Sequence, residues 1–315
     1  MASVPSLIVQ LTHDTYILNE CLSFRFEKER YSPSTVLTGK WYCKQDEFDD
    51  VISLSLMIDG KMLHVGYPTS GCEVMYENGR RVLKVNSRGY TQALALNQPT
   101  PGLQFDIDLE TLATSAVVCP GVSYQQNTPV VKYVNYYDGT SIWDAIVCYS
   151  IRATGTYPYI RGANTVSIST TPSDIGVVNV FPTNLISFGS GSDYSSLISE
   201  ISESDADGTY ATFVAQNEEA ISKNIIRKKE IPFNYEWIMD SELGLQSMLN
   251  YSMRGMCYDK IKFFGYSGGD LLDYVAINYT NRLPYIGKIS RLVLEGSQGN
   301  IITTVHCYRD AYCDN

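Results

Sequence analysis

The sequence is poor in positive charge. Its 315 residues include 24 lysines and arginines against 34 aspartates and glutamates, which gives a formal net charge of −10 at pH 7. Binding to DNA or RNA depends largely on cations that displace counterions from phosphates, and this composition has too few of them. An anionic membrane would repel the same surface. We therefore expect a protein that binds neither nucleic acid nor membranes.

Long apolar runs are also missing. No stretch approaches the roughly 20 apolar residues that a membrane-spanning helix needs. Residues 1–11 have no basic segment ahead of a sustained apolar one, so they do not predict a secretory signal. The chain is expected to be made and folded in a cytoplasm.

The eight cysteines contain no C-x-x-C pair, and there are only three histidines. The spacing typical of zinc sites is therefore absent. Most cysteines lie within apolar patterns, where a reducing compartment favours small buried thiols over the alternatives, disulfides or metal ligands. No cofactor and no metal site is predicted.

Short β-hairpins are abundant at both ends of the sequence. Residues 51–65 form two alternating apolar runs around Asp59-Gly60, and a second pair of runs flanks Asn78-Gly79. Both dipeptides tolerate the positive φ angles of a type I′ turn. Near the other end, Gly296-Ser-Gln-Gly299 joins two further strand-like runs. This pattern predicts two strand-rich units of similar construction.

The fold class predicted from this order is mainly β with α+β inserts: two small antiparallel β-barrel domains with two small α/β insert domains between them. The turn-forming segment 97–102 closes the first unit. The predicted parts are a first β-barrel domain (1–102), a small α+β insert (103–170), a second small α/β insert with a Ser/Gly-rich loop (171–230) and a second β-barrel domain (231–315).

Three helices are predicted between the two strand-rich units. Residues 106–118 have helical apolar spacing, and so does the segment after Ser141, where Asp144 completes a capping box. Residues 217–229 are acidic at the start and basic at the end, as the helix dipole favours. The polar segment 188–196 is expected to be a loop.

One motif resembles a catalytic nucleophile elbow. Residues 265–269 match G-x-S-x-G around Ser267, with Asp270, Asp273 and His306 following in the order of a hydrolase triad. The elbow requires a parallel sheet ahead of it, and here hairpins precede it. A glycine-rich connection between strands is the favoured interpretation.

Two acidic clusters also permit a functional interpretation. Residues 203–208 have the spacing of a calcium loop, but position 214, where a carboxylate is needed, is Val214. Residues 46–50 could pair carboxylates for glycosidic cleavage, although charge runs of this kind are usually solvated. His13 and His64 have no acidic or thiol partner at ligand spacing. No catalytic residue is predicted, and the protein is not expected to be an enzyme.

Several short segments in a particular order resemble the baseplate hub family of phage tails and related contractile injection particles. The segments that carry the likeness are Phe24-Arg-Phe-Glu-Lys, His64-Val65-Gly66-Tyr67, Leu83-Lys-Val-Asn-Ser-Arg-Gly-Tyr90, Gly139-Thr-Ser-Ile-Trp143-Asp-Ala-Ile146, Asn217-Glu-Glu-Ala-Ile221 and Lys288-Ile-Ser-Arg-Leu-Val-Leu294. They span most of the chain, and residues 171–200 match nothing in the family.

The resemblance implies a ring-shaped homotrimer that adapts a six-fold tail tube to a three-fold central spike, since three chains with two barrels each present six similar units. The implied partners are the tail tube protein, the central spike protein and a tape measure protein, in the baseplate of a virion or tail-like particle assembled in the host bacterial cytoplasm. Some hubs carry a peptidoglycan-cleaving domain, and since none follows here before Asn315, a structural role is expected. Candidate subunit-interface residues are the apolar strand residues Leu54, Leu56, Ile58, Ile289, Leu292 and Leu294.

A second function remains open. The 24 tyrosines outnumber the ten phenylalanines, and tyrosine suits both protein interfaces and sugar-binding surfaces. The alternative is therefore a tail-tip adsorption module that binds a host surface glycan or receptor.

Overall fold

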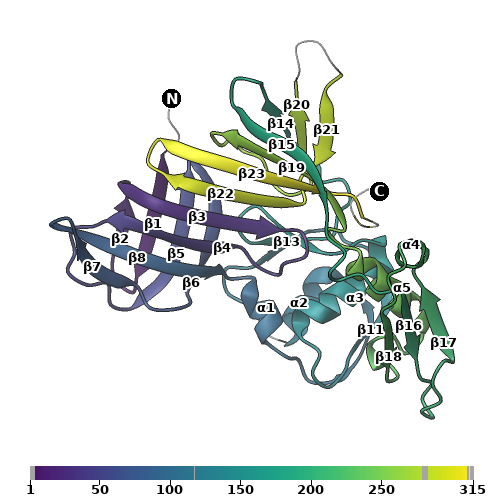
Figure 1. Cartoon of the computed structure of the whole chain (residues 1–315). Coiled ribbons are helices and arrows are strands. Elements are labelled where there is room, and N and C mark those ends of the chain that lie inside the picture. The colour runs from purple at the N-terminus through teal and green to yellow at the C-terminus, as the bar shows by residue number, and fades with distance from the viewer. Residues whose placement is uncertain (1–3, 117, 279–282, 311, 313–315) are drawn as a thin grey trace.

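The computed structural model describes residues 4–116, 118–278, 283–310 and 312. Strands dominate it and five α-helices lie among them in these residues, so the prediction of a mainly β protein with α+β inserts is confirmed. Figure 1 shows one large sheet with the helical parts gathered at one end of it. Among the described residues, no helix is both long and apolar enough to cross a bilayer.

Twelve strands form the large sheet, in the spatial order β15-β19-β23-β22-β3-β4-β8-β6-β5-β1-β2, with β7 also paired to β8. Their bounds are β1 (Pro5–Leu11), β2 (Thr15–Leu18), β3 (Cys21–Glu29), β4 (Val36–Tyr42), β5 (Val51–Ile58), β6 (Lys61–Pro68), β7 (Glu73–Glu77), β8 (Arg80–Gly89), β15 (Leu185–Ser192), β19 (Cys257–Phe264), β22 (Arg291–Ser297) and β23 (Asn300–Tyr308).

The predicted hairpins are confirmed. Asp59 and Gly60 connect β5 to β6 with φ angles of 50° and 80°, and Asn78 and Gly79 connect β7 to β8 with 50° and 76°. Positive φ at both central positions gives a turn whose twist matches that of the flanking strands. At the other end, Gly299 (φ 79°) closes the hairpin of β22 and β23.

The two strand-rich ends of the chain meet in one continuous sheet. Strand β3 pairs antiparallel with β22 from Glu29 opposite Arg291 to Phe24 opposite Gly296. Phe26 and Leu294 face each other in this register and are almost completely buried. The largest hydrophobic core accordingly contains residues from both ends of the chain.

A small sheet covers the C-terminal part of this core. It consists of β14 (Val177–Val180), β20 (Tyr274–Ile277) and β21 (Tyr285–Lys288), with β14 and β20 parallel. Val180 and Ile277 from this sheet are fully buried with Ile261 of β19 and Val305 of β23. The predicted strand at 274–279 is confirmed to Ile277, and its last residue lies outside the described part of the chain.

The first insert is a compact α+β unit with its own core. It contains α1 (Gln92–Leu96), β9 (Gly102–Ile107), α2 (Leu109–Ala116), β10 (Ser123–Tyr124), β11 (Val131–Tyr136), α3 (Ile142–Thr154), β12 (Tyr159–Arg161) and β13 (Thr165–Ser167). The predicted capping box begins α3: the Asp144 amide donates to Ser141 Oγ, and the Ser141 amide donates to the Asp144 carboxylate. The predicted helix at 106–118 begins later, since β9 continues to Ile107 and the Asp108 carboxylate accepts from the Thr111 amide.

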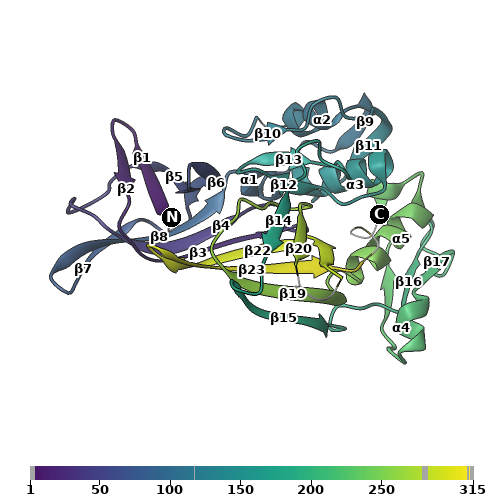
Figure 2. The ribbon, with the colours of Figure 1, turned by 90° about the horizontal axis from the view of Figure 1, so that it is seen from above.

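The second insert packs a small sheet against a helix. The sheet has the order β17 (Phe213–Gln216), β16 (Glu200–Glu203), β18 (Lys228–Ile231), and it is followed by the 3-10 turn η1 (Tyr235–Trp237) and by α5 (Ser241–Ser252). Leu245 and Leu249 of α5 are buried against Ile198 and Ile201. Both views place this unit beside α3 and β11 (Figures 1 and 2).

The structure corrects the predicted helix at 217–229. Helix α4 spans only Glu218–Ser222, and Asn224 then adopts a left-handed φ of 55°, a conformation that ends helices. The remainder turns into β18, which pairs with β16. Strand pairing with a distant segment overrides the local charge pattern here.

Two further expectations are corrected. Residues 188–192, expected to be a loop, form part of β15 and pair with β19. Glycine suits this strand because a Cβ at Gly191 would meet the Tyr258 ring at 2.6 Å. The strands expected to resume at about 231 begin only at Cys257, since α5 comes first and completes the second insert.

Candidate functional site

The serine motif does not assemble a triad. Ser267 is exposed in the loop after β19, and Gly265 at the start of this loop is hydrogen-bonded to Ile301 near the beginning of β23. His306 lies five residues further along β23, roughly 16 Å away at the usual rise of a strand, with its ring against Tyr258. The preferred interpretation as a glycine-rich connection is therefore supported.

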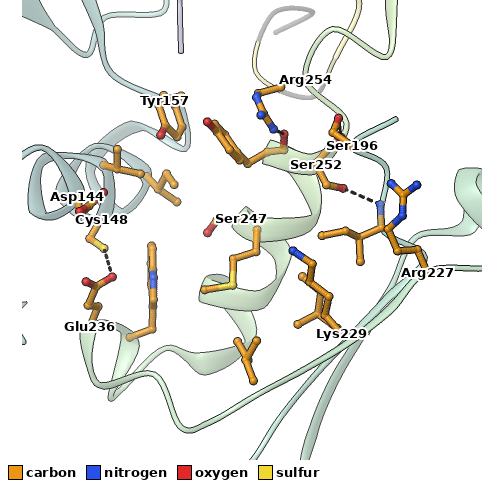
Figure 3. Close-up of a pocket in the computed structure, with 18 of the residues that line it drawn as sticks. Asp144, Cys148, Tyr157, Ser196, Arg227, Lys229, Glu236, Ser247, Ser252 and Arg254 are labelled. Carbon is orange, nitrogen blue, oxygen red and sulfur yellow. Dashed lines mark hydrogen bonds between the residues drawn. The ribbon is translucent and has the colours of Figure 1, made fainter. Parts of the chain in front are cut away.

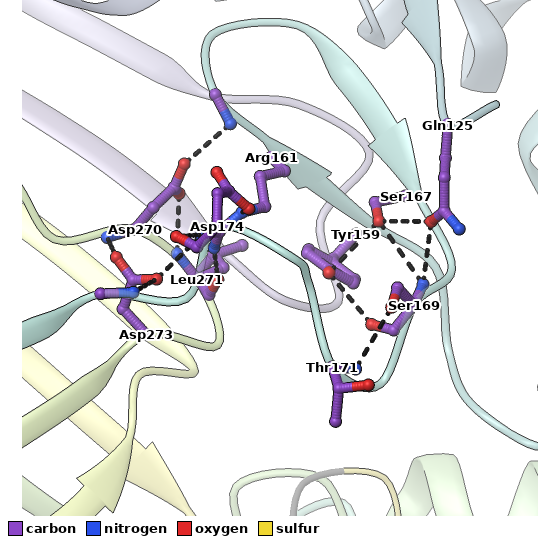
Figure 4. A network of polar contacts seen from close by, with 12 residues as sticks. Gln125, Tyr159, Arg161, Ser167, Ser169, Thr171, Asp174, Asp270, Leu271 and Asp273 are labelled. Atoms are coloured by element: carbon purple, nitrogen blue, oxygen red, sulfur yellow. Dashed lines mark hydrogen bonds and ion pairs between the residues drawn. The ribbon is translucent and has the colours of Figure 1, made fainter.

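The two aspartates after the serine motif belong to a buried polar network instead (Figure 4). The Asp270 carboxylate accepts from the Lys28 ammonium at 2.5 Å and from the Gly162 amide at 2.7 Å. The Asp273 carboxylate accepts from the Arg161 guanidinium and from the Gly176 amide, both at 2.9 Å. Each carboxylate thus holds the first insert or the covering sheet in place.

Arg161 is the centre of this network. Its guanidinium donates to the carboxylates of Asp174 and Asp273 and to the carbonyl oxygen of Leu271. Burial alone would lower the pKa of Arg161, but the two carboxylates outweigh burial and raise the pKa above its ordinary value. A charge paired in this way joins parts of the chain, which is a structural role and not that of a catalytic group.

The carboxylates of the two acidic clusters do not converge on a common point where a cation could bind. Glu203 is buried and accepts from the Asn234 amide, and burial raises its pKa. Asp205 accepts from the amides of Asp207 and Thr209 and shapes an exposed turn. Asp46 is exposed and pairs with Arg81. Among the described residues, no group of three or more Asp, Glu, His or Cys side chains could hold a metal ion.

Among the cysteines of the described residues, Cys21, Cys119, Cys148 and Cys307 are buried. Burial raises the pKa of Cys72 to about 11 and that of Cys21 to about 12, so both thiols stay protonated at neutral pH. Cys313 lies outside the described residues.

The six candidate interface residues are all in the chain's own interior. All six belong to the largest hydrophobic core, and each is at most 2% exposed. Leu54, Leu56 and Ile58 are residues of β5, whereas Ile289, Leu292 and Leu294 lie on or just before β22. Their side chains are occupied by contacts within one chain.

Exposed apolar side chains also occur on and near β15, the edge strand of the large sheet. Ile186 and Phe188 of β15 and Phe264 of β19 are 40%, 39% and 58% exposed, and Ile286 of β21 is 61% exposed. We call these four residues the β15 patch. Only Phe188 of these four residues lies in the segment 188–196 that the sequence predicted to be a loop.

A cavity of about 640 Å³ lies between the two inserts (Figure 3). One wall is α3, with Val147 and Ile151, and the Trp237 ring adjoins it. The opposite wall is formed by β18 and α5, with Lys229 and Met248. Volumes of this size are typical of ligand sites.

The polar groups of the cavity are distributed unevenly. Asp144 and Glu236 lie on the α3 side; Asp144 caps α3, and Glu236 accepts from Thr140 at 2.6 Å. Burial raises the pKa of Glu236. The cations Arg227, Lys229 and Arg254 lie on the other side. The cavity therefore has an acidic wall that is already hydrogen-bonded and a basic wall facing it.

Comparison with solved structures places this architecture among phage tail proteins. A tail protein from Neisseria meningitidis MC58 superposes with a TM-score of 0.70 at 12% identity over 99% of this chain and 98% of the other. The 43 kDa tail protein of prophage MuSo2 from Shewanella oneidensis gives 0.64 at 11% identity over 96% and 97%.

A third similar structure comes from E. coli. It is described as a component of the type VI secretion system with structural similarity to the T4 bacteriophage tail proteins gp27 and gp5, and it gives a TM-score of 0.55 at 7% identity over 93% of this chain and 75% of the other. No protein-family model and no curated protein matches the sequence. The chain thus has the fold of phage tail and baseplate proteins, and the resemblance to the baseplate hub family is confirmed at the level of the fold.

Proposed function

We propose that the protein is a structural baseplate hub of a phage or phage-tail-like contractile injection particle. In this role three copies form a ring that joins a six-fold tail tube to a three-fold central spike, with a tape measure protein as a further partner. The particle is assembled in the host bacterial cytoplasm. The proposal is for a structural protein and not an enzyme, since the Ser267 motif and the acidic clusters serve the fold.

One observation carries this proposal: the two ends of the chain form the two halves of one sheet, joined at β3 and β22. Each half has its own hairpins, so three copies would present six units of related construction to a six-fold partner. The sheet ends in the edge strands β2 and β15. Edge strands offer unpaired backbone groups that a neighbouring subunit can use.

The β15 patch supports the same arrangement. Ile186 and Phe188 on the edge strand β15 are exposed, as is Phe264 on β19, and exposed apolar side chains beside an open sheet edge are candidates for subunit contacts. The Phe188 ring also lies 4.8 Å from the ring of Tyr285, which connects the edge to the covering sheet. Subunit contacts are proposed here in place of the six buried candidates.

The experiment is a mass measurement by light scattering and native mass spectrometry, on the chain alone and on the chain co-expressed with a candidate spike protein. The hub role predicts three copies of the 35.2 kDa chain in the complex. Phe188→Asp should lower the trimer fraction, whereas Tyr76→Asp on β7, also at an exposed aromatic residue, should not. A monomer in both samples would refute the hub role.

The high tyrosine content gives little support to the alternative of an adsorption module, because many of the tyrosines are not on the surface. Tyr31, Tyr308 and Tyr312 are buried together, with Tyr157, Tyr251 and Tyr258 packed against them where the inserts meet the large sheet. The exposed tyrosines Tyr76, Tyr137, Tyr194 and Tyr210 come from four separate segments. Tight binding of the monomer to a glycan array would restore this alternative.

A further inference from the structure

The cavity between the inserts has an open strand along one side. Strand β18 pairs with β16 and is the last strand of its sheet, so its other edge carries no strand among the described residues. Successive side chains of a strand point to opposite faces. Lys229 and Ile231 line the cavity, as does Arg227 just before the strand, whereas Lys228 is not part of the lining.

The cations of the cavity are not neutralised by the protein. Arg227 donates to the carbonyl oxygens of Ser195 and Leu197, and Arg254 donates to the Tyr251 carbonyl oxygen. Within the described part of the chain, neither these two arginines nor Lys229 forms an ion pair. The Lys229 ammonium points toward the middle of the cavity in Figure 3. The carboxylates of the cavity, Asp144 and Glu236, lie on the α3 side and are hydrogen-bonded there, so the three cations remain available to an anionic group.

The wall that faces these cations has apolar side chains beside Asp144 and Glu236. Val147 and Ile151 of α3 and the Trp237 ring lie across from Met248 of α5. The space between them is about 640 Å³, enough for several side chains but not for a folded domain. An occupant must therefore be thin, apolar on the side that enters the cavity and negatively charged near Lys229.

We propose that this cavity binds an extended acidic peptide segment of a partner protein, which adds a strand to the free edge of β18. The backbone of the segment hydrogen-bonds to β18, as in other cases of strand addition to a sheet edge. Alternate side chains enter the cavity: apolar ones lie between α3 and α5, and a carboxylate pairs with Lys229. This site goes beyond the proposed hub role and stands independently of it.

The test uses a fluorescein-labelled heptapeptide with isoleucine at positions 2 and 6, glutamate at position 4 and threonine at the other four positions. A matched peptide has lysine in place of glutamate. Fluorescence anisotropy measures binding to the full-length chain. The acidic peptide is expected to bind saturably, and the lysine peptide at least about ten-fold more weakly, because a charge-assisted hydrogen bond is replaced by repulsion.

Two variants on one strand provide the control. Lys229→Gln removes the cation that faces the cavity and should weaken binding of the acidic peptide about ten-fold. Lys228→Gln removes the same charge on the other face of β18, where Lys228 forms an exposed ion pair with Glu200, and should leave binding unchanged. Hydrogen exchange should show new protection of the backbone amides of residues 228–231 when the peptide binds.

Three results would overturn the proposal. The first is the absence of saturable binding by the acidic peptide, and the second is equal weakening by Lys228→Gln and Lys229→Gln, which would indicate unspecific charge attraction. The third is binding of dodecanoate with no binding of the peptide, which would identify the cavity as a site for small amphiphiles instead.

Discussion

The guanidinium of Arg161 lies 2.9 Å from the carboxylate of Asp273, although 112 residues separate the two in the sequence. Arg161 ends β12 of the first insert, and Asp273 precedes β20 of the covering sheet. Both side chains are largely buried, at 11% and 6% exposure. This ion pair attaches the first insert to the segment that leads into the covering sheet.

Removal of Asp273 should therefore be costly. Asp273→Ala leaves the Arg161 charge buried beside one exposed partner and removes the acceptor of the Gly176 amide, and we expect the free energy of unfolding to fall by about 3–5 kcal/mol. Asp174 is the other carboxylate bound to Arg161, and its side chain is 71% exposed. Asp174→Ala should therefore cost less than about 1 kcal/mol. Urea unfolding followed by tryptophan fluorescence compares the two; equal losses would contradict the assigned role.

The burial of His64 predicts a dependence of stability on pH. Its Nδ1 lies 2.7 Å from Thr35 Oγ1 and its Nε2 2.8 Å from Ser87 Oγ, and burial lowers the pKa of the ring to about 3. The unfolded chain, with a histidine pKa near 6.5, binds a proton that the folded chain does not between these two values. The free energy of unfolding should therefore decrease as pH falls from about 6.5 toward 3, by about 1.4 kcal/mol per pH unit for this one group. Above pH 7 the protonation of His64 should make no contribution to the pH dependence.

Comparison of variants isolates this contribution. His64→Gln should flatten the slope of unfolding free energy against pH between pH 4 and pH 6 relative to the wild-type chain. His13→Gln, at an exposed position, is the matched control. An unchanged slope in His64→Gln would show that the ring is protonated in the folded chain.

A side chain at Gly60 should destabilise the turn only through its effect on the backbone conformation. A Cβ at Gly60 would meet no atom within 4 Å, but φ is +80°. Gly60→Ala should therefore lose about 1–2 kcal/mol, the cost of the left-handed region for an L-residue. Gly71 has the same free space without a positive φ, and Gly71→Ala should change stability by less than about 0.5 kcal/mol. Thermal unfolding measures both, and similar shifts in Tm would contradict the explanation.

Because β3 pairs with β22, a substitution at this pairing should destabilise both halves of the large sheet together. Leu294 is fully buried opposite Phe26, and Leu294→Ala should cost about 2–5 kcal/mol through the cavity that it leaves. Native-state hydrogen exchange should then show reduced protection in β4 as well as in β23. Loss of protection confined to β23 and β22 would mean that the halves unfold separately.

Local features were predictable where a few neighbouring residues determine the conformation. Asp59-Gly60 and Asn78-Gly79 tolerate positive φ, and Ser141 with Asp144 satisfies free amides of α3, so these turns and this cap were predicted correctly. Predictions from longer segments were less successful. Residues 217–229 have a helical charge pattern, yet Asn224 ends α4 and β18 pairs with β16.

The candidate sites show the same division. Exclusion of a serine triad followed from the sequence alone, because hairpins precede Ser267. The interface candidates such as Leu54 and Leu294 were selected as apolar strand residues, and a single sequence contains no information on which face of a strand is covered by its own chain. The β15 patch and the cavity at Lys229 therefore became visible only in three dimensions.

By itself the sequence determined the mainly β composition, the tight hairpin turns and the acidic character that disfavours nucleic acid as a ligand, because each depends on dihedral preferences or charges that act within a few residues. Only the tertiary structure decided that β3 pairs with β22, that residues 188–192 are a strand, and that the two inserts enclose a cavity with one basic wall. Pairing of strand edges depends on burial of apolar surface between segments hundreds of residues apart, and no local pattern specifies the partner.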